Sequence, residues 1–229
     1  MIEAADMDSR YARNVPALTE AECALLRTKQ VAVIGCGGLG GHLVENLARI
    51  GVGSIRVVDG DVFEESNLNR QILAEISLLG AGKAEAAAAR IQRINPDVKA
   101  EAIHAFLDEA NAAKLIAGCD AVLDGLDSIP ARIVLARACG EAGIPCIYGA
   151  ISGWVAQAAI ALPGDSLLVR LYAEAVELRD SSALSFTPAL CAAMQSALCV
   201  KLLVGRPVKT GTLFYFDLLH QEFDESPLL

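Results

Sequence analysis

The sequence predicts an α/β fold in which a mostly parallel, doubly wound sheet is flanked by helices. Short apolar segments typical of buried strands alternate with helical segments from residue 31 to residue 151. A glycine-rich turn, GCGGLG at residues 35–40, follows the first of these strands and leads into a helical pattern. After Gly153 the pattern changes to strands spaced for antiparallel pairing, around one long apolar helix. We therefore expect a Rossmann-like sheet that is extended by antiparallel C-terminal strands.

The N-terminal region, residues 1–29, is predicted to be a polar arm followed by a short helix. Residues 1–13 carry mixed charges and no apolar stretch, so we expect no signal peptide. Thr19 and Glu22 have the spacing of a capping box, which starts a helix that runs to about Lys29.

The first β–α–β unit contains the glycine turn. The β-branched run at residues 31–34 predicts a strand, residues 42–50 a helix, and residues 54–59 a second strand. The polar loop that follows, residues 60–71, is longer than a typical connection in an α/β fold. We therefore expect this loop to have a function.

The remainder of the chain continues the alternation without repeats or a clear domain boundary, which favours a single domain over residues 1–229. Residues 167–187 show no clear pattern and are predicted to form a mobile loop. We expect helices at 82–94, 108–117, 130–142 and 188–205, and strands at 98–104, 121–124, 146–151, 154–162, 212–217 and 218–223.

The composition provides enough apolar residues for a large core. Hydrophobic residues make up 54% of the chain, which is enough for a core and for a buried subunit interface. The net charge of −9 argues against nucleic acid as a partner. Gln195, Ser196 and Lys201 interrupt the longest apolar region, which predicts a buried helix and no contact with a membrane.

The seven cysteines do not form a metal-binding pattern. No two of them are spaced as C-x-x-C, and no histidine lies at ligand spacing from a pair, so we expect no zinc site. An odd number of cysteines in apolar contexts is typical of reduced, buried thiols in the cytoplasm.

Polar residues collect at the predicted carboxyl ends of the strands, where ligands bind in folds of this type. Asp59 and Asp127 follow strands there, and Arg70 lies on a loop that can fold over the same edge. Lys83 begins a helix, where the helix dipole disfavours a cation unless an anion is bound. Two cations, carboxylates and a glycine turn suit a nucleoside triphosphate with Mg²⁺ better than a dinucleotide. The simpler alternatives are a solvated surface charge for Arg70 and a helix N-cap for Asp127.

These motifs resemble the ThiF/MoeB/HesA family, the bacterial relatives of ubiquitin-activating enzymes. The resemblance extends from about Arg10 to Phe223, and the Ser66–Gln71 block is more specific than the glycine turn. The matching segments are Arg10-Tyr11-Ala12-Arg13, GCGGLG at 35–40, Asp59-Gly60-Asp61, SNLNRQ at 66–71, Lys83 and Leu126-Asp127-Ser128.

The resemblance implies ATP-dependent adenylation of a carboxylate, usually the C-terminal Gly-Gly of a small β-grasp sulfur-carrier protein similar to ThiS or MoaD. By the same resemblance, Asp59 contacts the ribose, Asn67, Arg70 and Lys83 hold the phosphates, and Asp127 binds Mg²⁺. The other residues expected to bind ATP are Gly35, Gly37, Gly38, Gly40, Asp61, Ser66 and Ser128.

The resemblance also implies a homodimer. The arginine that matches Arg13 reaches the ATP site of the partner subunit in the family, so residues 1–29 are expected at the interface. The high apolar content independently favours a buried interface.

Two features depart from many members of the family. The zinc-binding C-x-x-C pairs are absent, and residues 178–187, before the last long helix, contain no cysteine. The nearest thiol, Cys191, is predicted to lie inside that helix. The residues thus favour adenylation over covalent sulfur chemistry on this chain.

Several other functions fit parts of the sequence. The adenylated carboxylate could belong to a peptide or to a nucleoside on tRNA. A nicotinamide-dependent oxidoreductase would need a catalytic His or Tyr that we cannot identify, and a non-catalytic scaffold would not need Arg70, Lys83 and Asp127.

Overall fold

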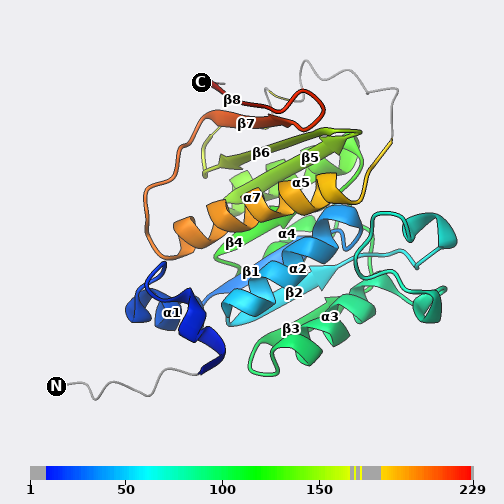
Figure 1. Cartoon of the computed structure of the whole chain (residues 1–229), viewed down its shortest axis with the longest axis horizontal. Coiled ribbons are helices and arrows are strands. Elements are labelled where there is room, and N and C mark those ends of the chain that lie inside the picture. Colours follow the sequence, from blue (N-terminus) through cyan, green and yellow to red (C-terminus); the bar gives the residue numbers. More distant parts are fainter. Residues whose placement is uncertain (1–8, 166–167, 169–170, 172–181, 228–229) are drawn as a thin grey trace.

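The computed structural model describes residues 9–165, 168, 171 and 182–227, and an eight-stranded sheet runs through them (Figure 1). The strand order is β3-β2-β1-β4-β5-β6-β7-β8. The first five of these strands are parallel, and the last three join by antiparallel pairing, as predicted. The strands are β1 Gln30–Ile34, β2 Ser54–Val58, β3 Lys99–Ile103, β4 Ala121–Asp124, β5 Cys146–Ser152, β6 Val155–Ala161, β7 Thr212–Asp217 and β8 Glu222–Pro227.

Helices cover both faces of the sheet and enclose two hydrophobic cores. In Figure 1, α2, α3 and α7 lie in front of the sheet, and α4 and α5 lie behind it. The predicted doubly wound α/β fold is therefore confirmed. The helices are η1 Ser9–Asn14, α1 Glu20–Leu26, α2 Gly38–Ile50, η2 Glu65–Asn67, η3 Ile76–Leu78, α3 Lys83–Ile94, α4 Ala112–Ile116, α5 Ile129–Ala142 and α7 Phe186–Leu203.

Strand β2 pairs with one edge of β1, and β4 pairs with the opposite edge of β1. This change of direction opens a crevice at the carboxyl ends of β1 and β4. Glycines allow the two strand ends to approach each other there. Gly35 has φ +89°, and a Cβ on it would lie 2.6 Å from the carbonyl oxygen of Gly125.

Helix α2 begins at Gly38, four residues before the predicted start, so it includes part of the glycine turn. Gly40 lies against the preceding strand end, since a Cβ there would stand 1.8 Å from the carbonyl oxygen of Gly35. Only a residue without a side chain allows the helix to start so close to β1.

Helix α7 is long and apolar enough to cross a membrane by length and composition, and no other helix among the described residues passes that test. It packs instead on α2, β5 and β6 (Figure 1). Its fully buried Gln195 donates hydrogen bonds to the carbonyl oxygens of Asp124 and Ile147. The prediction of a buried helix is confirmed.

The N-terminal segment is fastened to the rest of the molecule, although the sequence had suggested a separate polar arm. The capping box forms, since Thr19 Oγ1 accepts a hydrogen bond from the N–H of Glu22 and the Glu22 carboxylate accepts one from the N–H of Thr19. Arg206 pairs with the same carboxylate and lowers the pKa of Glu22 to about 2. Tyr11 is buried and receives a hydrogen bond from Asn95.

Two further predicted elements start about four residues later than expected. The helix predicted at 108–117 shrinks to α4, because the Asp108 carboxylate accepts the N–H groups of Ala110 and Asn111 and forms a turn instead. The strand predicted at 218–223 also starts later than expected. Asp217 accepts the N–H groups of Leu219 and His220, which makes a turn, and β8 starts at Glu222. Most of the loop predicted at 167–187 lies outside the described residues.

Replacing Gly40 with alanine tests the contact between α2 and β1. Gly40→Ala should lower the free energy of unfolding by roughly 3 kcal/mol or more, or prevent folding, because backbone atoms must move apart. Gly140, inside α5, has open space where a Cβ would lie, so Gly140→Ala should leave stability unchanged or raise it by about 0.5–1 kcal/mol. Denaturant unfolding of both variants measures the difference, and equal effects would contradict this account.

Candidate functional site

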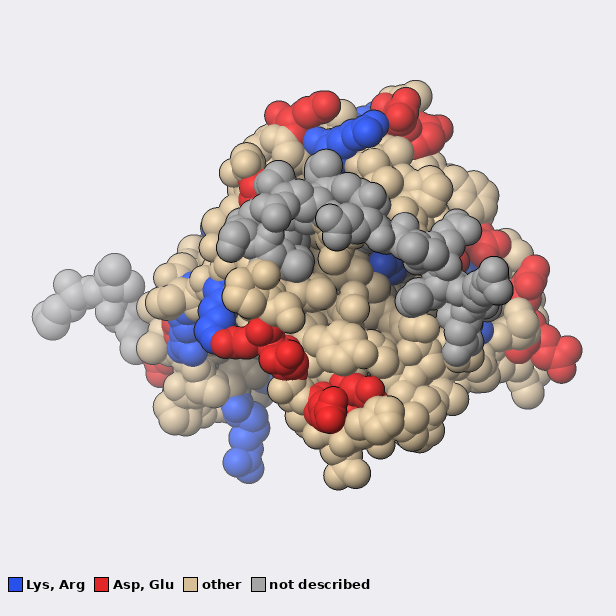
Figure 2. Space-filling view, turned by 90° about the horizontal axis from the view of Figure 1, so that it is seen from above, with Lys and Arg blue, Asp and Glu red and all other residues tan. Residues whose placement is uncertain are grey.

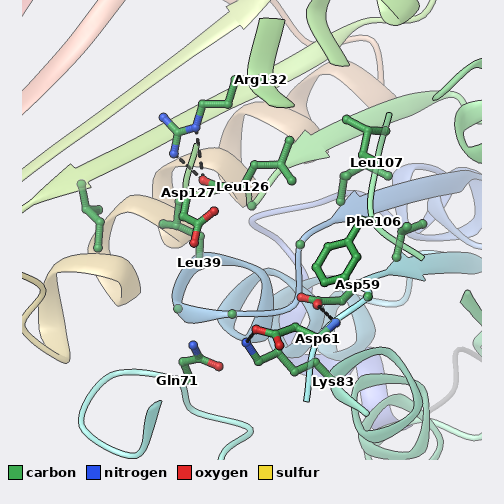
Figure 3. Close-up of a pocket in the computed structure, with 18 of the residues that line it drawn as sticks. Leu39, Asp59, Asp61, Gln71, Lys83, Phe106, Leu107, Leu126, Asp127 and Arg132 are labelled. Carbon is green, nitrogen blue, oxygen red and sulfur yellow. Dashed lines mark hydrogen bonds and ion pairs between the residues drawn. The ribbon is translucent and has the colours of Figure 1, made fainter. Parts of the chain in front are cut away.

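A cavity of about 490 Å³ lies at the carboxyl ends of β1, β2 and β4, where the sequence placed the site (Figure 3). Its volume suits a small-molecule ligand. Gly35, Gly37 and Gly38 form part of its wall. The charged residues that line it are Asp59, Asp61, Arg70, Lys83, Asp127 and Arg132.

Asp59 follows β2 and holds the glycine turn in shape. One carboxylate oxygen accepts the N–H of Cys36 at 2.7 Å, and the other accepts the N–H of Asp61 at 2.8 Å. Each carboxylate oxygen can accept a further hydrogen bond, so Asp59 remains suited to a ribose hydroxyl. That contact stays a prediction.

Lys83 is the first residue of α3, and its side chain is almost completely buried beside the cavity. Its ammonium donates to Asp61 at 2.6 Å, and this hydrogen bond lowers the pKa of Asp61. The sequence analysis favoured a bound anion as the reason for a lysine at this position. Asp61 supplies a negative charge beside Lys83, and the ammonium keeps two N–H donors beyond this bond.

Arg70 lines the cavity and is anchored to its own loop. The guanidinium donates to the carbonyl oxygen of Ser66 and to the side chain of Asn69, both at 2.9 Å. Asn67 is buried and accepts the N–H of Glu64, so it shapes the loop. Ser66 and Asn67 do not line the cavity, and their predicted contacts with a nucleotide stay predictions.

Asp127 follows β4, and its carboxylate points into the cavity from the side opposite Lys83 (Figure 3). The N-cap alternative for Asp127 is wrong, because Ser128 caps α5 by accepting the N–H of Ala131. Asp127 makes no hydrogen bond or ion pair with another residue in the described part of the chain, so its carboxylate is available to a ligand. Ser128 itself does not line the cavity.

Two other predicted residues lie outside the cavity wall. Gly40 is required for packing, as shown above, rather than for ligand contact. Arg13 belongs to η1, is exposed, and does not line the cavity of its own chain. A role for Arg13 in an ATP site therefore requires a second subunit.

The sequence analysis missed Arg132, which lies on α5 beside Asp127. Its guanidinium donates to the carbonyl oxygen of Leu126 and stands 3.8 Å from the buried carboxylate of Asp124. Burial raises the pKa of Asp124 to about 6, although Arg132 opposes that shift. The available signal was an arginine in the first turns of a helix that follows a strand end. Arginines at such positions are also common on protein surfaces.

The sequence analysis also missed the apolar wall of the cavity, and it gave no role to one polar residue of the SNLNRQ block beside the glycine turn. Phe106 and Leu107, on the loop after β3, line the side near Asp59 (Figure 3). Phe106 is 70% exposed. Gln71 lines the side near Gly37. Phe106 and Leu107 belong to no motif, whereas Gln71 is the last residue of the SNLNRQ block.

The cysteines are all free and buried. Cys191 lies inside α7, as predicted, and its Sγ contacts the carbonyl oxygens of Ala150 and Gln157. Burial raises the pKa of this thiol to about 12, so it is not a nucleophile near neutral pH. Among the described residues no group of three or more His, Cys, Asp and Glu side chains is placed to hold a metal ion.

The surface charge is mainly negative where it is visible. Figure 2 looks onto the end of the molecule at which β8 lies. Described Asp and Glu side chains gather there in several groups, and the described Lys and Arg side chains form no continuous patch on this face. Phosphates of a nucleic acid therefore have no extended basic surface on the described part of this face.

Comparisons with known proteins agree with this geometry. Residues 11–228 match the family model of the ThiF family. The chain is 35% identical over 209 residues to the SAMP-activating enzyme E1 of Haloferax volcanii, covering 88% of this chain and 77% of that protein. It is 31% identical over 212 residues to the molybdopterin-synthase adenylyltransferase of Escherichia coli, covering 89% and 85%. A crystal structure of E. coli MccB with ATP shares the fold, with a TM-score of 0.83 at 20% identity, over 96% of this chain and 72% of that one.

Thiol labelling tests the buried state of the cysteines. The native protein should show no fast-reacting thiol, and all seven should react after unfolding, because burial restricts access and disfavours the thiolate. Labelling with a chromogenic disulfide, with and without denaturant, gives the count. One native thiol that reacts as fast as free cysteine would show that a nucleophilic sulfur exists.

Proposed function

The chain belongs to the ThiF family and is an adenylyltransferase, and we propose that it activates the C-terminal Gly-Gly carboxylate of a small β-grasp sulfur-carrier protein with ATP and Mg²⁺. The observation that carries the proposal is the arrangement of the cavity. Two cations, Arg70 and Lys83, lie near the N-terminus of a helix, with an available carboxylate, Asp127, opposite. This is the charge pattern that a triphosphate with a divalent cation requires.

The proposed reaction joins a substrate carboxylate oxygen to the α-phosphorus of ATP. The bond between that phosphorus and the oxygen that leads to the β-phosphate breaks, and its electron pair leaves with pyrophosphate. Negative charge gathers on the phosphate oxygens in the transition state. Arg70, Lys83 and the free N–H groups at the start of α2 are placed to stabilise that charge.

Asp127 fits a magnesium ion that the phosphates also bind. A single carboxylate together with phosphate oxygens and water is a common ligand set for Mg²⁺. The ion would neutralise part of the triphosphate charge when bound. The chain would position the Asp127 carboxylate for this ion. The carboxylate is free because Ser128, and not Asp127, caps α5.

The product of this reaction would be an acyl-adenylate that another molecule consumes. The described cysteines offer no exposed thiol, and the segment from 178 to 187 contains none, so the chain is not expected to form a thioester or persulfide itself. The cytoplasmic location expected from the seven reduced cysteines stays a prediction.

We also propose that the protein works as a homodimer. Arg13 is exposed and does not line the cavity of its own chain, so it is available to a second subunit. The loop that carries Arg70 also exposes large apolar side chains, which an interface would cover. These are Leu68, Ile72, Ile76 and Leu79, of which Ile76 is 81% exposed.

Pyrophosphate exchange into ATP tests the proposed activity. Exchange should require Mg²⁺ and a carrier that ends in Gly-Gly, and calorimetry should show binding of ATP with Mg²⁺ but not of NAD. Binding of NAD without ATP would remove the adenylation proposal. Exchange with a peptide or a tRNA in place of the carrier would replace the proposed substrate.

Asp127→Asn tests the metal-binding carboxylate. The change should lower the exchange rate about a hundredfold or more and leave the thermal unfolding temperature nearly unchanged, since the side chain makes no described contact that supports the fold. Glu109→Gln, an exposed carboxylate outside the cavity, is the control and should keep full activity. Full activity of Asp127→Asn would reject this role.

Mixing of two inactive variants tests the contribution of the partner subunit. Arg13→Ala and Asp127→Asn homodimers should each be nearly inactive. A mixed dimer should regain up to half of the wild-type activity, because one of its two sites then combines Arg13 of one chain with Asp127 of the other. If verified subunit exchange restores no activity, or if the protein is an active monomer, the proposal is wrong.

A further inference from the structure

Arg132 is a cavity residue to which neither the motifs nor the proposed reaction assign a role. It lies near the start of α5 and close to Asp127 (Figure 3). The residue is 8% exposed, although it lines the cavity. An arginine is rarely buried to this extent unless its guanidinium is paired with other groups, so its contacts indicate its role.

The backbone of Leu126 is held from two sides by buried charged groups. The guanidinium of Arg132 donates to the carbonyl oxygen of Leu126 from Nε and from Nη2 (Figure 3). The Asp124 carboxylate accepts the N–H of the same residue at 2.9 Å. Asp124 Oδ2 also stands 3.8 Å from Arg132 Nε, which makes the two side chains an ion pair. Both polar backbone groups of Leu126 are therefore fixed.

The Leu126 carbonyl belongs to the peptide bond that leads into Asp127. Because a peptide bond is planar, the direction of this carbonyl also sets the positions of the Asp127 nitrogen and Cα. The Asp127 carboxylate makes no hydrogen bond or ion pair with another residue in the described part of the chain. Its direction in the cavity therefore depends on the backbone that Arg132 and Asp124 hold.

Tyr148, on β5, restricts the guanidinium further. Its ring is buried, and the centre of the ring lies 5.5 Å from Arg132 Cζ, within the range of a cation–π contact. Asp124 is the last residue of β4, so the guanidinium is held by groups from two neighbouring strands. Arg132 thus ties the turn before Asp127 to the sheet as well as to α5.

We propose that Arg132 is a positioning residue that, together with Asp124, aims the Asp127 carboxylate at the magnesium ion of bound ATP. The inference rests on the proposed function, because it concerns the metal ligand of that reaction. Groups that orient a metal ligand contribute to metal affinity although they do not touch the ion. The alternative is that Arg132 contacts the nucleotide directly, since it lines the cavity.

The test needs a variant that removes the guanidinium without leaving a buried charge unpaired. Arg132→Met alone would isolate the Asp124 carboxylate and could unfold the chain. Arg132→Met combined with Asp124→Asn removes both charges, and the asparagine keeps an oxygen that can accept the N–H of Leu126. This paired variant should unfold near the wild-type temperature. Arg132→Lys keeps a cation beside Asp124 but loses the two-pronged contact with the carbonyl, and it serves as a second variant.

The measured quantity is the ratio of the ATP affinity with Mg²⁺ to the ATP affinity with a chelator, obtained by calorimetry. This ratio reports the coupling between metal and nucleotide without any need for turnover. The paired variant should lower the ratio about tenfold and leave the affinity for metal-free ATP unchanged. Arg132→Lys should lower the ratio by a smaller factor.

Arg56→Met is the matched control. Arg56 also donates to backbone carbonyls, those of Leu115 and Ala117, but it lies outside the cavity. Its loss can lower the unfolding temperature, but it should leave the ratio unchanged. A fall of the ratio in Arg56→Met as large as in the paired variant would contradict the inference, because any buried arginine would then have the same effect.

Addition of Asp127→Asn to the paired variant decides whether Arg132 acts through Asp127. If it does, the ratio should fall no further than in Asp127→Asn alone, since groups that act as a unit have non-additive effects. Losses that multiply overturn the inference. An unchanged ratio in the paired variant and in Arg132→Lys also overturns it, as does weaker binding of metal-free ATP.

The wild type separates this inference from the proposed function. If the wild type does not bind ATP, the proposed function fails and the inference fails with it. If it binds ATP equally well with and without Mg²⁺, the metal role of Asp127 and the inference both fail. If Mg²⁺ strengthens ATP binding and the ratio depends on Asp127 but not on Arg132, the inference alone fails.

Discussion

The close approach of Gly40 to the carbonyl of Gly35 is the constraint on which the site depends. It allows α2 to begin directly at the end of β1, so that the first N–H groups of the helix face the cavity. Gly125 makes the matching approach from β4, and Asp127 follows two residues later. A larger side chain at either glycine contact would push the helix or the strand away. The separation between the helix N-terminus and the Asp127 carboxylate would then change.

Both cations that the proposed function assigns to the phosphates have hydrogen-bond partners within the chain. Lys83 is paired with the Asp61 carboxylate, whereas Arg70 donates to neutral acceptors of its own loop. Such pairing lowers the electrostatic cost of keeping cations at a helix N-terminus. Phosphates that enter the cavity can share these donors, because an ammonium and a guanidinium each offer several N–H groups. Asp127 makes no hydrogen bond or ion pair with a described residue, which suits its proposed role as a magnesium ligand.

Local sequence signals predicted most of the fold. β4 and β7 have the predicted bounds, since a short apolar run between turn residues is sufficient to define a strand. The shortened helix α4 and the late start of β8 were not predictable in this way. In each case an aspartate, Asp108 or Asp217, binds nearby backbone N–H groups and replaces helix or strand with a turn. That competition depends on backbone torsion angles, which a pattern of hydrophobic and polar residues does not encode.

By itself the sequence determined the charged edge of the site, because Asp59, Lys83 and Asp127 each follow or begin an element whose place in the fold is predictable. Only the tertiary structure brought Gln71 and Arg132 to the same cavity. They come from a loop and from a helix on opposite sides of it, and their nearness results from packing between segments far apart in the chain. The tertiary structure also decided that Asp127 is free for a ligand, because the backbone at the start of α5 turns the neighbouring serine, and not the aspartate, onto the helix N–H groups.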